Sequence, residues 1–250
     1  GAVVTACDIH DAEWLGDNYK VCENLGVNTV LGEGYLDNLT DPIIIKTPGM
    51  RYDKPELKKA VENGAVLTSE MEIFFELCPS HIIAVTGSDG KTTTTSLIHK
   101  MLSDGGYKTW LGGNIGNPLL SFVDEMTEDD YVVLELSSFQ LHTMKKSPER
   151  AVITNLSPNH LDWHIDYQEY IDAKTNIYKA MSGENRLVLN ADNADSMKLL
   201  PIDNCEVKTF SRRGEGYVKL NGDTIVCNGE SVLNICDIKI PGMHNVENYM

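Results

Sequence analysis

The sequence lacks any apolar run that approaches the roughly 20 residues needed to span a bilayer, and it shows no secretory signal peptide. Its six cysteines form no CxxC pair and no closely spaced framework. That argues against disulfides and indicates thiols kept reduced in the cytosol. Together these absences predict a cytoplasmic protein with no membrane partner.

Positive charge is also scarce, with 21 Lys and Arg against 37 Asp and Glu and a formal net charge of −16. Such a chain repels a polyphosphate backbone, so nucleic acid is not an expected partner. A bound nucleotide would need local compensation from a lysine, backbone N–H groups and a metal ion. The 250 residues are 42% hydrophobic, which is enough to build the core of one or two domains.

Neither end of the sequence carries a complete structural element. The first residues, GAVVTACD, are typical of a strand that runs into an acidic turn, and no Met or earlier element precedes them. The last residues, GMHNVENYM, are typical of a helix that has just begun. We therefore expect a fragment of a longer protein.

Short apolar runs alternate with helical segments, which predicts an α/β fold with a parallel sheet and ligands at the carboxyl ends of its strands. The predicted strands are Ala2–Ala6, Ile43–Lys46, Val66–Thr68, Ile82–Thr86, Tyr131–Leu134, Ala151–Thr154 and Arg186–Leu189. The predicted helices are Pro55–Asn63, Met71–Leu77, Thr92–Ser103 and Gln168–Met181. Period-2 runs separated by Asn-Gly in residues 216–240 predict a small antiparallel addition. A Cys-Pro-Ser breaker at 78–80 suggests two domains, 1–80 and 81–250.

The stretch HIIAVTGSDGKTTTTSLIHKML, residues 81–102, has the pattern of a phosphate-binding loop. A buried strand leads into the flexible turn Gly87–Gly90, and a helix follows at once. Lys91 would reach the β- and γ-phosphates of a nucleotide, and the Thr92 hydroxyl would ligate Mg²⁺. Val85 stands where the strict GxxxxGK[ST] pattern has its first glycine. The alternative is an ordinary glycine-rich turn with an exposed lysine.

Three further polar positions follow predicted strands or lie on a predicted helix. Glu135 ends an apolar strand, where it is either a second Mg²⁺ ligand or a solvated carboxylate. His160 and His164 are four residues apart, as in half of a zinc site, but Pro158 makes the segment a loop and surface histidines are the alternative. Lys174 by itself is typical of a solvated helix face. Two metal ions beside a phosphate loop would suit phosphoryl transfer to a carboxylate, which indicates an ATP- or GTP-dependent enzyme.

Several blocks of sequence resemble the Mur ligases, in the order in which that family has them. They are TGSDGKTTTTSL, GGNIGNPLL, ELSSFQL, TNLSPNHLDWH, YIDAKTNIY, VLNADN and GMHNVENYM. The pair ELSSFQL and GGNIG resembles the branch that adds D-glutamate. The resemblance implies a partial Rossmann-like UDP-binding domain followed by the central phosphate-loop ATPase domain. It also implies ATP-dependent ligation of D-glutamate to UDP-N-acetylmuramoyl-L-alanine through an acyl phosphate, in peptidoglycan precursor synthesis. Another ligase of the superfamily and a non-catalytic nucleotide-binding module are the alternatives.

The resemblance also implies roles for individual residues, with ATP and two Mg²⁺ ions as cofactors. The metal ligands would be Thr92, Glu135, His160 and Lys174, the last as a carbamylated lysine. The ATP-binding residues would be Gly87, Ser88, Asp89, Gly90, Lys91, Thr92, Thr93, Asn245 and Asn248. The substrate-binding residues would be Asp8, Gly49, Asn114, Ser137 and His160. Lys91, Glu135, His160 and Lys174 would carry the catalysis.

The alternatives for the peripheral residues are simple ones: a strand-end turn for Asp8 and helix capping for Asn245 and Asn248. The sequence departs from the family pattern in lacking the first strand and glycine-rich loop of the UDP domain. It also lacks the C-terminal domain that binds the amino acid. We therefore expect residues 1–250 alone to bind ATP but to catalyse little or no ligation. We also expect the protein to be a monomer.

Overall fold

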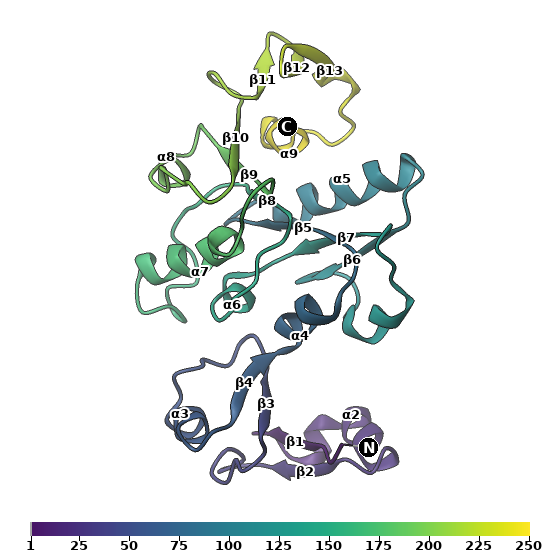
Figure 1. Ribbon diagram of the computed structural model, residues 1–250, viewed down its shortest axis with the longest axis vertical. Helices are drawn as coiled ribbons and strands as arrows, with labels where there is room; N and C mark the ends of the chain where they lie inside the picture. The colour runs from purple at the N-terminus through teal and green to yellow at the C-terminus, as the bar shows by residue number, and fades with distance from the viewer. Residues whose placement is uncertain (1) are drawn as a thin grey trace. The chain divides into compact units, whose positions relative to one another are not determined.

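A computed structural model describes residues 2–250, and the chain divides into two compact units, Gly1–Thr68 and Ser69–Met250 (Figure 1). The first unit contains two pairs of strands. In one pair β1 (Thr5–Asp8) runs parallel to β2 (Asn28–Leu31), and in the other β3 (Ile43–Lys46) pairs with β4 (Val66–Ser69). Its helices are α1 (Ala12–Leu15), α2 (Asp17–Asn24) and α3 (Pro55–Glu62).

The second unit is built on a nine-stranded sheet with the order β13-β12-β11-β10-β9-β8-β5-β7-β6. Neighbouring strands from β6 to β11 are parallel, and β12 and β13 are antiparallel. This confirms the predicted α/β fold with a mainly parallel sheet and an antiparallel addition. The strands are β5 (His81–Thr86), β6 (Thr109–Gly113), β7 (Tyr131–Glu135), β8 (Arg150–Ile153), β9 (Arg186–Asn190), β10 (Glu206–Ser211), β11 (Val218–Asn221), β12 (Thr224–Cys227) and β13 (Glu230–Asn234).

Helices cover both faces of this sheet: α5 lies on one face and α6 and α7 on the other (Figure 1). The helices are α4 (Glu70–Leu77), α5 (Lys91–Asp104), α6 (Ser138–Leu141), α7 (Tyr167–Lys179), α8 (Ala194–Met197) and α9 (Met243–Tyr249), with 3₁₀ turns η1 (Leu120–Glu125) and η2 (Ile235–Asp237). No helix within residues 2–250 is both long and apolar enough to cross a membrane.

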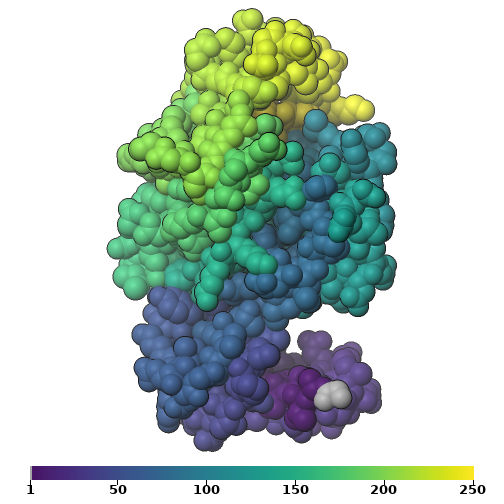
Figure 2. All heavy atoms as spheres, in the orientation of Figure 1, coloured from purple at the N-terminus to yellow at the C-terminus, as the bar shows by residue number. Residues whose placement is uncertain are grey.

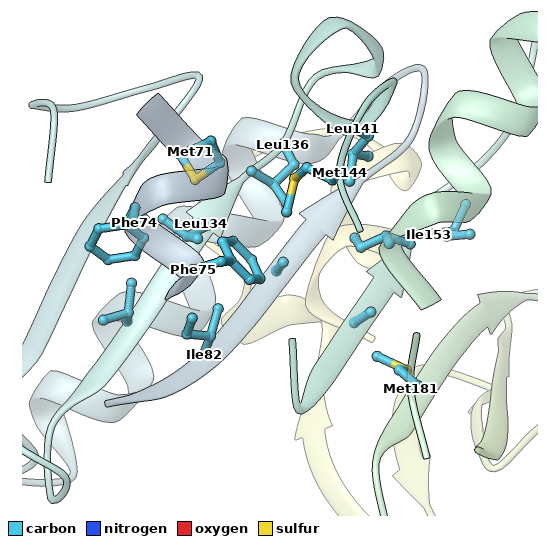
Figure 3. Packing of buried hydrophobic residues seen from close by; sticks show 14 of the residues in the cluster. Met71, Phe74, Phe75, Ile82, Leu134, Leu136, Leu141, Met144, Ile153 and Met181 are labelled. Carbon is cyan, nitrogen blue, oxygen red and sulfur yellow. The ribbon is translucent and has the colours of Figure 1, made fainter. Parts of the chain in front are cut away.

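The alternation of side chains along the central strands decides which groups reach which face. Val132 and Leu134 of β7 lie in the core cluster with α4, α6 and α7. Glu135, the next residue, points to the opposite face, because its carboxylate bonds to Thr92 in α5. Figure 3 shows this cluster from close by, with Met71, Phe74, Phe75, Ile82, Leu134, Leu136, Leu141, Met144, Ile153 and Met181 labelled.

Helix α4 belongs to the second unit, so the division falls at residue 68 rather than near residue 80 as the sequence predicts. The physical reason is its buried face. Met71, Phe74 and Phe75 are at most 7% exposed and pack in the same cluster as the central strands. The Ser69 hydroxyl caps the helix by accepting from the Glu72 N–H. The burial of these two aromatic rings therefore places α4 in the second unit, even though the Cys-Pro-Ser sequence that suggested the boundary follows the helix.

The antiparallel ribbon turns at the two glycines that its sequence predicts. Asn221 pairs with Thr224 across Gly222-Asp223, and Cys227 pairs with Glu230 across Asn228-Gly229. Asn228 and Gly229 both have positive φ, 49° and 88°, as a two-residue type I′ hairpin requires. Beyond the ribbon the chain returns to the body of the unit, where the yellow C-terminal helix α9 lies against blue α5 (Figure 2).

Candidate functional site

The predicted phosphate loop, Gly87–Gly90, lies between β5 and α5 at the carboxyl end of the central strands. Here β5 sits between β7 and β8, so the strand order switches direction at this point, where open α/β sheets bind ligands. The residues after β8 hold the loop: Thr154 Oγ1 donates to the Asp89 carbonyl at 2.6 Å, and Asn155 both accepts from the Asp89 N–H and donates to the Asp89 carbonyl, each at 3.0 Å. The loop is therefore fixed before any ligand arrives.

Two positions in the loop require glycine. Gly87 has φ +145° and a Cβ there would collide with Thr154 Oγ1 and crowd the backbone of Asn155. Gly90 has φ +80° and a Cβ there would collide with the side chain of Asn248. The loop thus combines left-handed backbone with close packing, which no other residue type supplies.

Thr92, Glu135 and Asn114 form a hydrogen-bonded chain beside the loop. Thr92 Oγ1 donates to Glu135 Oε2 at 2.7 Å, and Asn114 Nδ2 donates to Glu135 Oε1 at 2.8 Å. Glu135 is only 2% exposed, while Thr92 and Asn114 are exposed. The structure therefore brings a hydroxyl, a carboxylate and an amide from α5, β7 and the end of β6 to one point. A hydroxyl and a carboxylate are oxygen donors that suit Mg²⁺.

Lys91 begins α5 and folds back over the loop, where its Nζ donates to the Ser88 carbonyl at 2.9 Å. Ser88 is buried, and its hydroxyl lies 2.8 Å from the Tyr170 hydroxyl and accepts from the Ser157 N–H at 2.9 Å. Thr93 follows in the first turn of the helix, whose N–H groups have no intrahelical partners. Successive N–H groups and an ammonium are the usual cradle for phosphate oxygens.

Lys174 is buried at 2% exposure, which overturns the interpretation of its helix face as solvated. Its Nζ donates to the Gly87 carbonyl at 2.8 Å and to Thr86 Oγ1 at 3.2 Å. It also lies 4.8 Å from the centre of the Tyr170 ring. Burial, reinforced by the positive charge of Lys91 and opposed by Glu135, lowers the pKa of Lys174 to about 7. A large fraction of this amine is therefore neutral near neutral pH.

The sequence predicted no role for Tyr170, Thr154 or Asn155, although these residues contact the loop and Lys174. Thr154 ends the predicted strand Ala151–Thr154 and Asn155 follows it. Because parallel neighbours end at one edge of a sheet, this position in the sequence was the signal that could have identified them. Tyr170 precedes Lys174 by one helical turn, which places the two on the same face.

A cavity of about 130 Å³ lies beside the loop and has Thr94, Ile98, Val152, Phe210 and Asn248 among its lining. Its walls are mixed apolar and polar, which suits a flat heteroaromatic ring. Asn248 Nδ2 donates to Asn245 Oδ1 at 3.0 Å, and Asn245 Nδ2 donates to the Pro241 carbonyl at 2.7 Å. Asn245 therefore supports the turn before α9.

Ser137 and His160 lie on loops of the second unit. The Ser137 hydroxyl accepts from the Gln140 N–H at 3.2 Å, and Gln140 Oε1 accepts from the Ser137 N–H at 3.0 Å, which is a capping box for α6. His160 is exposed with φ +52°, and its ring lies 4.9 Å from the Phe139 ring. Within residues 2–250 no hydrogen bond or ion pair joins its ring to Glu135 or Lys174.

The two predicted substrate residues of the first unit lie at a strand end and in a turn. The Asp8 carboxylate ends β1 and accepts from the His10 N–H at 2.9 Å, and this backbone hydrogen bond is the main reason that its pKa is lowered. Gly49 lies in the exposed turn that follows β3. Both positions suit contacts with a ligand at the carboxyl ends of the strands.

Comparison with known proteins identifies relatives of this chain. The model of the Mur ligase middle domain matches residues 85–250. The UDP-N-acetylmuramoylalanine–D-glutamate ligase of Acetivibrio thermocellus is 53% identical, and that of Clostridium novyi is 52% identical. Each alignment covers 100% of this chain and 55% of the relative. The chain thus spans about half the length of these curated relatives.

Solved structures share the fold at low sequence identity. A UDP-N-acetylmuramate:L-alanyl-γ-D-glutamyl-meso-diaminopimelate ligase from Neisseria superposes with a TM-score of 0.61 at 18% identity, over 98% of this chain and 82% of that one. A UDP-N-acetylmuramoyl-L-alanyl-D-glutamate–2,6-diaminopimelate ligase gives 0.60 at 22% identity, over 77% of this chain and 51% of that one. The domain match covers well over half of the sequence, and the chain therefore belongs to the Mur ligase family.

Proposed function

We propose that the protein containing this chain joins D-glutamate to UDP-N-acetylmuramoyl-L-alanine at the expense of ATP, in the synthesis of peptidoglycan precursors. The observation that carries the proposal is the 2.7 Å hydrogen bond from Thr92 Oγ1 to Glu135 Oε2 beside the phosphate loop. The names of the relatives at about 50% identity supply the substrates. A carboxylate is a poor electrophile, and phosphorylation would give it a leaving group that an amine can displace.

In this proposal the loop residues and Lys91 bind the phosphates of ATP, and the cavity beside Asn248 takes adenine. Thr92 and Glu135 would hold a Mg²⁺ ion, since a hydroxyl and a carboxylate are the hard oxygen donors that the ion prefers. When bound, the ion would neutralise charge that develops on the transferred phosphoryl group. Lys91 lies at the start of α5, so it can move from the Ser88 carbonyl to a phosphate oxygen without disturbing the fold.

Lys174 is proposed to carry a carbamate and, with His160, to hold a second Mg²⁺ ion. A neutral amine is the form that adds to CO₂, and the lowered pKa of Lys174, about 7, keeps that form available. The addition joins Nζ of the neutral amine to the CO₂ carbon and releases one proton, which leaves an anion with two oxygen donors where the protonated lysine would carry a positive charge. The nearby ammonium of Lys91 would then stabilise this anion instead of opposing a cation.

Asn114 and Ser137 are proposed to contact the muramoyl part of the substrate, and Asp8 and Gly49 its uracil and diphosphate, with the first unit, Gly1–Thr68, as the UDP-binding domain. D-Glutamate would be bound outside residues 1–250, so this chain alone would bind nucleotide without ligating. We further propose a cytoplasmic monomer.

The test is phosphate release from ATP by the full-length protein in the presence of UDP-N-acetylmuramoyl-L-alanine. D-Glu, L-Glu, L-Ala and L-Lys are compared, with Lys91→Ala as the inactive variant. We expect release that requires D-Glu and disappears in the variant. Release with another amino acid would move the protein to a related ligase activity. ATP binding without any release would leave a non-catalytic nucleotide-binding module.

The carbamate has its own test, which is independent of ligation. Protein equilibrated with ¹³C-bicarbonate should show a carbamate carbon resonance that is lost in Lys174→Ala. The same resonance should remain in Lys179→Ala, which changes an exposed lysine on the same helix. An identical spectrum for wild type and Lys174→Ala would contradict the modification.

A further inference from the structure

His142, His164 and Glu169 form a compact cluster where the end of α6, the loop before α7 and the first turn of α7 meet. His142 Nε2 lies 3.1 Å from Glu169 Oε1, and His164 Nδ1 lies 3.5 Å from Glu169 Oε2. One ligand atom from each residue lies within 4.8 Å of the other two. We infer that these three side chains form a binding site for a transition-metal ion of the zinc type, separate from the proposed magnesium centre.

The distances suit a tetrahedral ion. Ligand atoms about 2.0–2.2 Å from a zinc ion at tetrahedral angles lie roughly 3.4 Å from one another. His142 Nε2 lies 3.1 Å from Glu169 Oε1 and His164 Nδ1 lies 3.5 Å from Glu169 Oε2, so the two histidines approach different oxygens of one carboxylate at about that separation. All three ligand atoms lie within 4.8 Å of one another, so small side-chain movements would bring them to tetrahedral separations. Two imidazoles and one carboxylate also form a known three-ligand zinc set that leaves a fourth position for water.

Three separate elements hold the donors in place. His142 is the C-cap of α6, His164 lies in the loop before α7, and Glu169 lies in the first turn of α7. The Ile165 N–H donates to Glu169 Oε2 at 2.6 Å, which orients the carboxylate. On the far side of the ring, His164 Nε2 lies 3.0 Å from the Ser138 hydroxyl, so Nδ1 can face the ion while Nε2–H donates.

The cluster is shielded from solvent, which strengthens binding of a charged ion. The side chains of His164, His142 and Glu169 are 0%, 10% and 19% exposed. The Trp163 ring meets the His142 ring edge-on at 5.4 Å, and the Tyr170 ring meets the His164 ring edge-on at 5.4 Å.

The donor set also distinguishes this site from a magnesium site. Two imidazole nitrogens with one carboxylate favour zinc and its neighbours, whereas the ligands of Mg²⁺ are predominantly oxygens, waters included. The sequence suggests His160 with His164 as half of a zinc site, but the structure instead brings His142 and Glu169 to His164. An ion here would tie α6, which follows Ser137, to the loop that carries His160. The site does not depend on the ligase reaction.

The alternative is that Glu169 only bridges the two histidines as a hydrogen-bonded clamp. Metal titration of the full-length protein distinguishes the two possibilities. The protein is first stripped of metal with a chelator, and excess Mg²⁺ is then added so that it occupies sites made of oxygen ligands. Zn²⁺ binding is followed by calorimetry, and Co²⁺ is used as a spectroscopic probe. The variants are His142→Gln, which lies at the rim of the cluster, and Glu169→Gln, which keeps the side-chain shape.

His81→Gln is the matched control, because His81 Nδ1 also lies 2.9 Å from a carboxylate, Glu149, but with both side chains about 45% exposed and no third donor described. We expect one equivalent of Zn²⁺ for wild type and His81→Gln, and a loss of affinity of roughly 100-fold or more in the other two variants. Co²⁺ should give tetrahedral d–d absorption without thiolate charge transfer.

Three results would overturn the site. The first is wild-type protein that binds no Zn²⁺, which leaves the hydrogen-bonded clamp. The second is binding that is unchanged in both His142→Gln and Glu169→Gln. The third is a Co²⁺ spectrum with thiolate charge transfer, which would place the ion on cysteines. The cobalt spectrum of wild type needs no variant, so the proposal stays testable even if a variant does not fold.

Discussion

Thr92 Oγ1 donates a 2.7 Å hydrogen bond to Glu135 Oε2, while Asn114 Nδ2 donates to Glu135 Oε1 at 2.8 Å. The carboxylate is thus oriented from both sides, and it reaches the α5 face because β7 alternates its side chains. We predict that Glu135→Gln lowers ligase turnover by roughly 100-fold or more, since a metal ligand contributes several kcal/mol at the transition state. Phosphate release measured across a Mg²⁺ titration checks this.

The matched control for this variant is Glu128→Gln, which makes the same change at an exposed position before β7. Glu128→Gln should keep wild-type turnover and the wild-type Mg²⁺ dependence. If Glu135→Gln also kept both, the carboxylate would only orient Asn114 and Thr92, and the assignment of the metal site would fail.

Gly87→Ala tests whether the shape of the loop, rather than its charge, carries nucleotide binding. The added methyl group would meet Thr154 Oγ1 in a backbone conformation, φ +145°, that alanine rarely adopts. We expect ATP affinity to fall by at least roughly tenfold while the far-ultraviolet circular dichroism stays unchanged, because the displacement is local.

Gly183→Ala is the control for backbone strain alone. Gly183 also has positive φ, +61°, but a Cβ there would meet nothing within 4 Å. It should therefore lose stability without losing ATP affinity. Equal losses of affinity in both variants would mean that the effect comes from general destabilisation and not from the loop.

The local patterns predicted β5, β7, β8, β9, α5, α7 and the two hairpin turns, because each depends on residues that are adjacent in sequence, but they did not predict β6 or β10. The predicted strand Ala2–Ala6 is in fact Thr5–Asp8, because its pairing with β2 begins only at Thr5. The phosphate loop was likewise visible as one contiguous stretch. These features follow from the periodicity of apolar residues and from the residue types that favour tight turns.

What the sequence could not predict depends on contacts between distant segments. Lys174 is typical of a solvated helix face until α7 packs on β5 and buries it beside Gly87, 87 positions away. His142 and Glu169 carry no motif that links them to His164. Residues 69–80 join the second unit because Phe74 packs against its core. The Cys-Pro-Ser sequence at 78–80 gives no information about that contact. Tertiary packing decided each of these.

Phe74→Ala tests the assignment of α4 to the second unit. Phe74 is fully buried in the cluster, so its loss should lower the free energy of unfolding of that unit by about 3–5 kcal/mol. Leu77→Ala, on the same helix but 58% exposed, should change it by less than about 1 kcal/mol. Urea unfolding followed by tryptophan fluorescence measures both, and equal small effects would contradict the packing.

Asp130 provides a prediction for the pH dependence of stability. Its side chain is 5% exposed and accepts from Trp110 Nε1 and Thr127 Oγ1, each at 2.8 Å, with Lys108 Nζ at 2.9 Å. Burial by itself would raise the pKa of Asp130, but the hydrogen bonds from Trp110, Lys108 and Thr127 outweigh it and lower the pKa to about 2. The folded state therefore favours the ionised form.

The sign of the effect follows from the lowered pKa. In the unfolded chain Asp130 takes up its proton near its ordinary pKa of 3.8, whereas in the folded state it does so only near 2. The stabilisation is therefore fully present above about pH 4 and is lost as the pH falls toward 2. Near neutral pH, Asp130→Asn should lower the free energy of unfolding by about 1–3 kcal/mol, as expected for a buried carboxylate with several donors.

The difference in unfolding free energy between wild type and Asp130→Asn should therefore shrink as the pH falls from about 4 to 2, because wild type loses the same interaction by protonation. Urea unfolding at several pH values measures this difference. Asp129→Asn, at an exposed neighbouring position, controls for the general effect of acid on a strongly acidic chain. A difference that stays constant down to pH 2 would show that Asp130 contributes through shape and hydrogen bonding alone. In that case its charge would play no part in the stability of the fold.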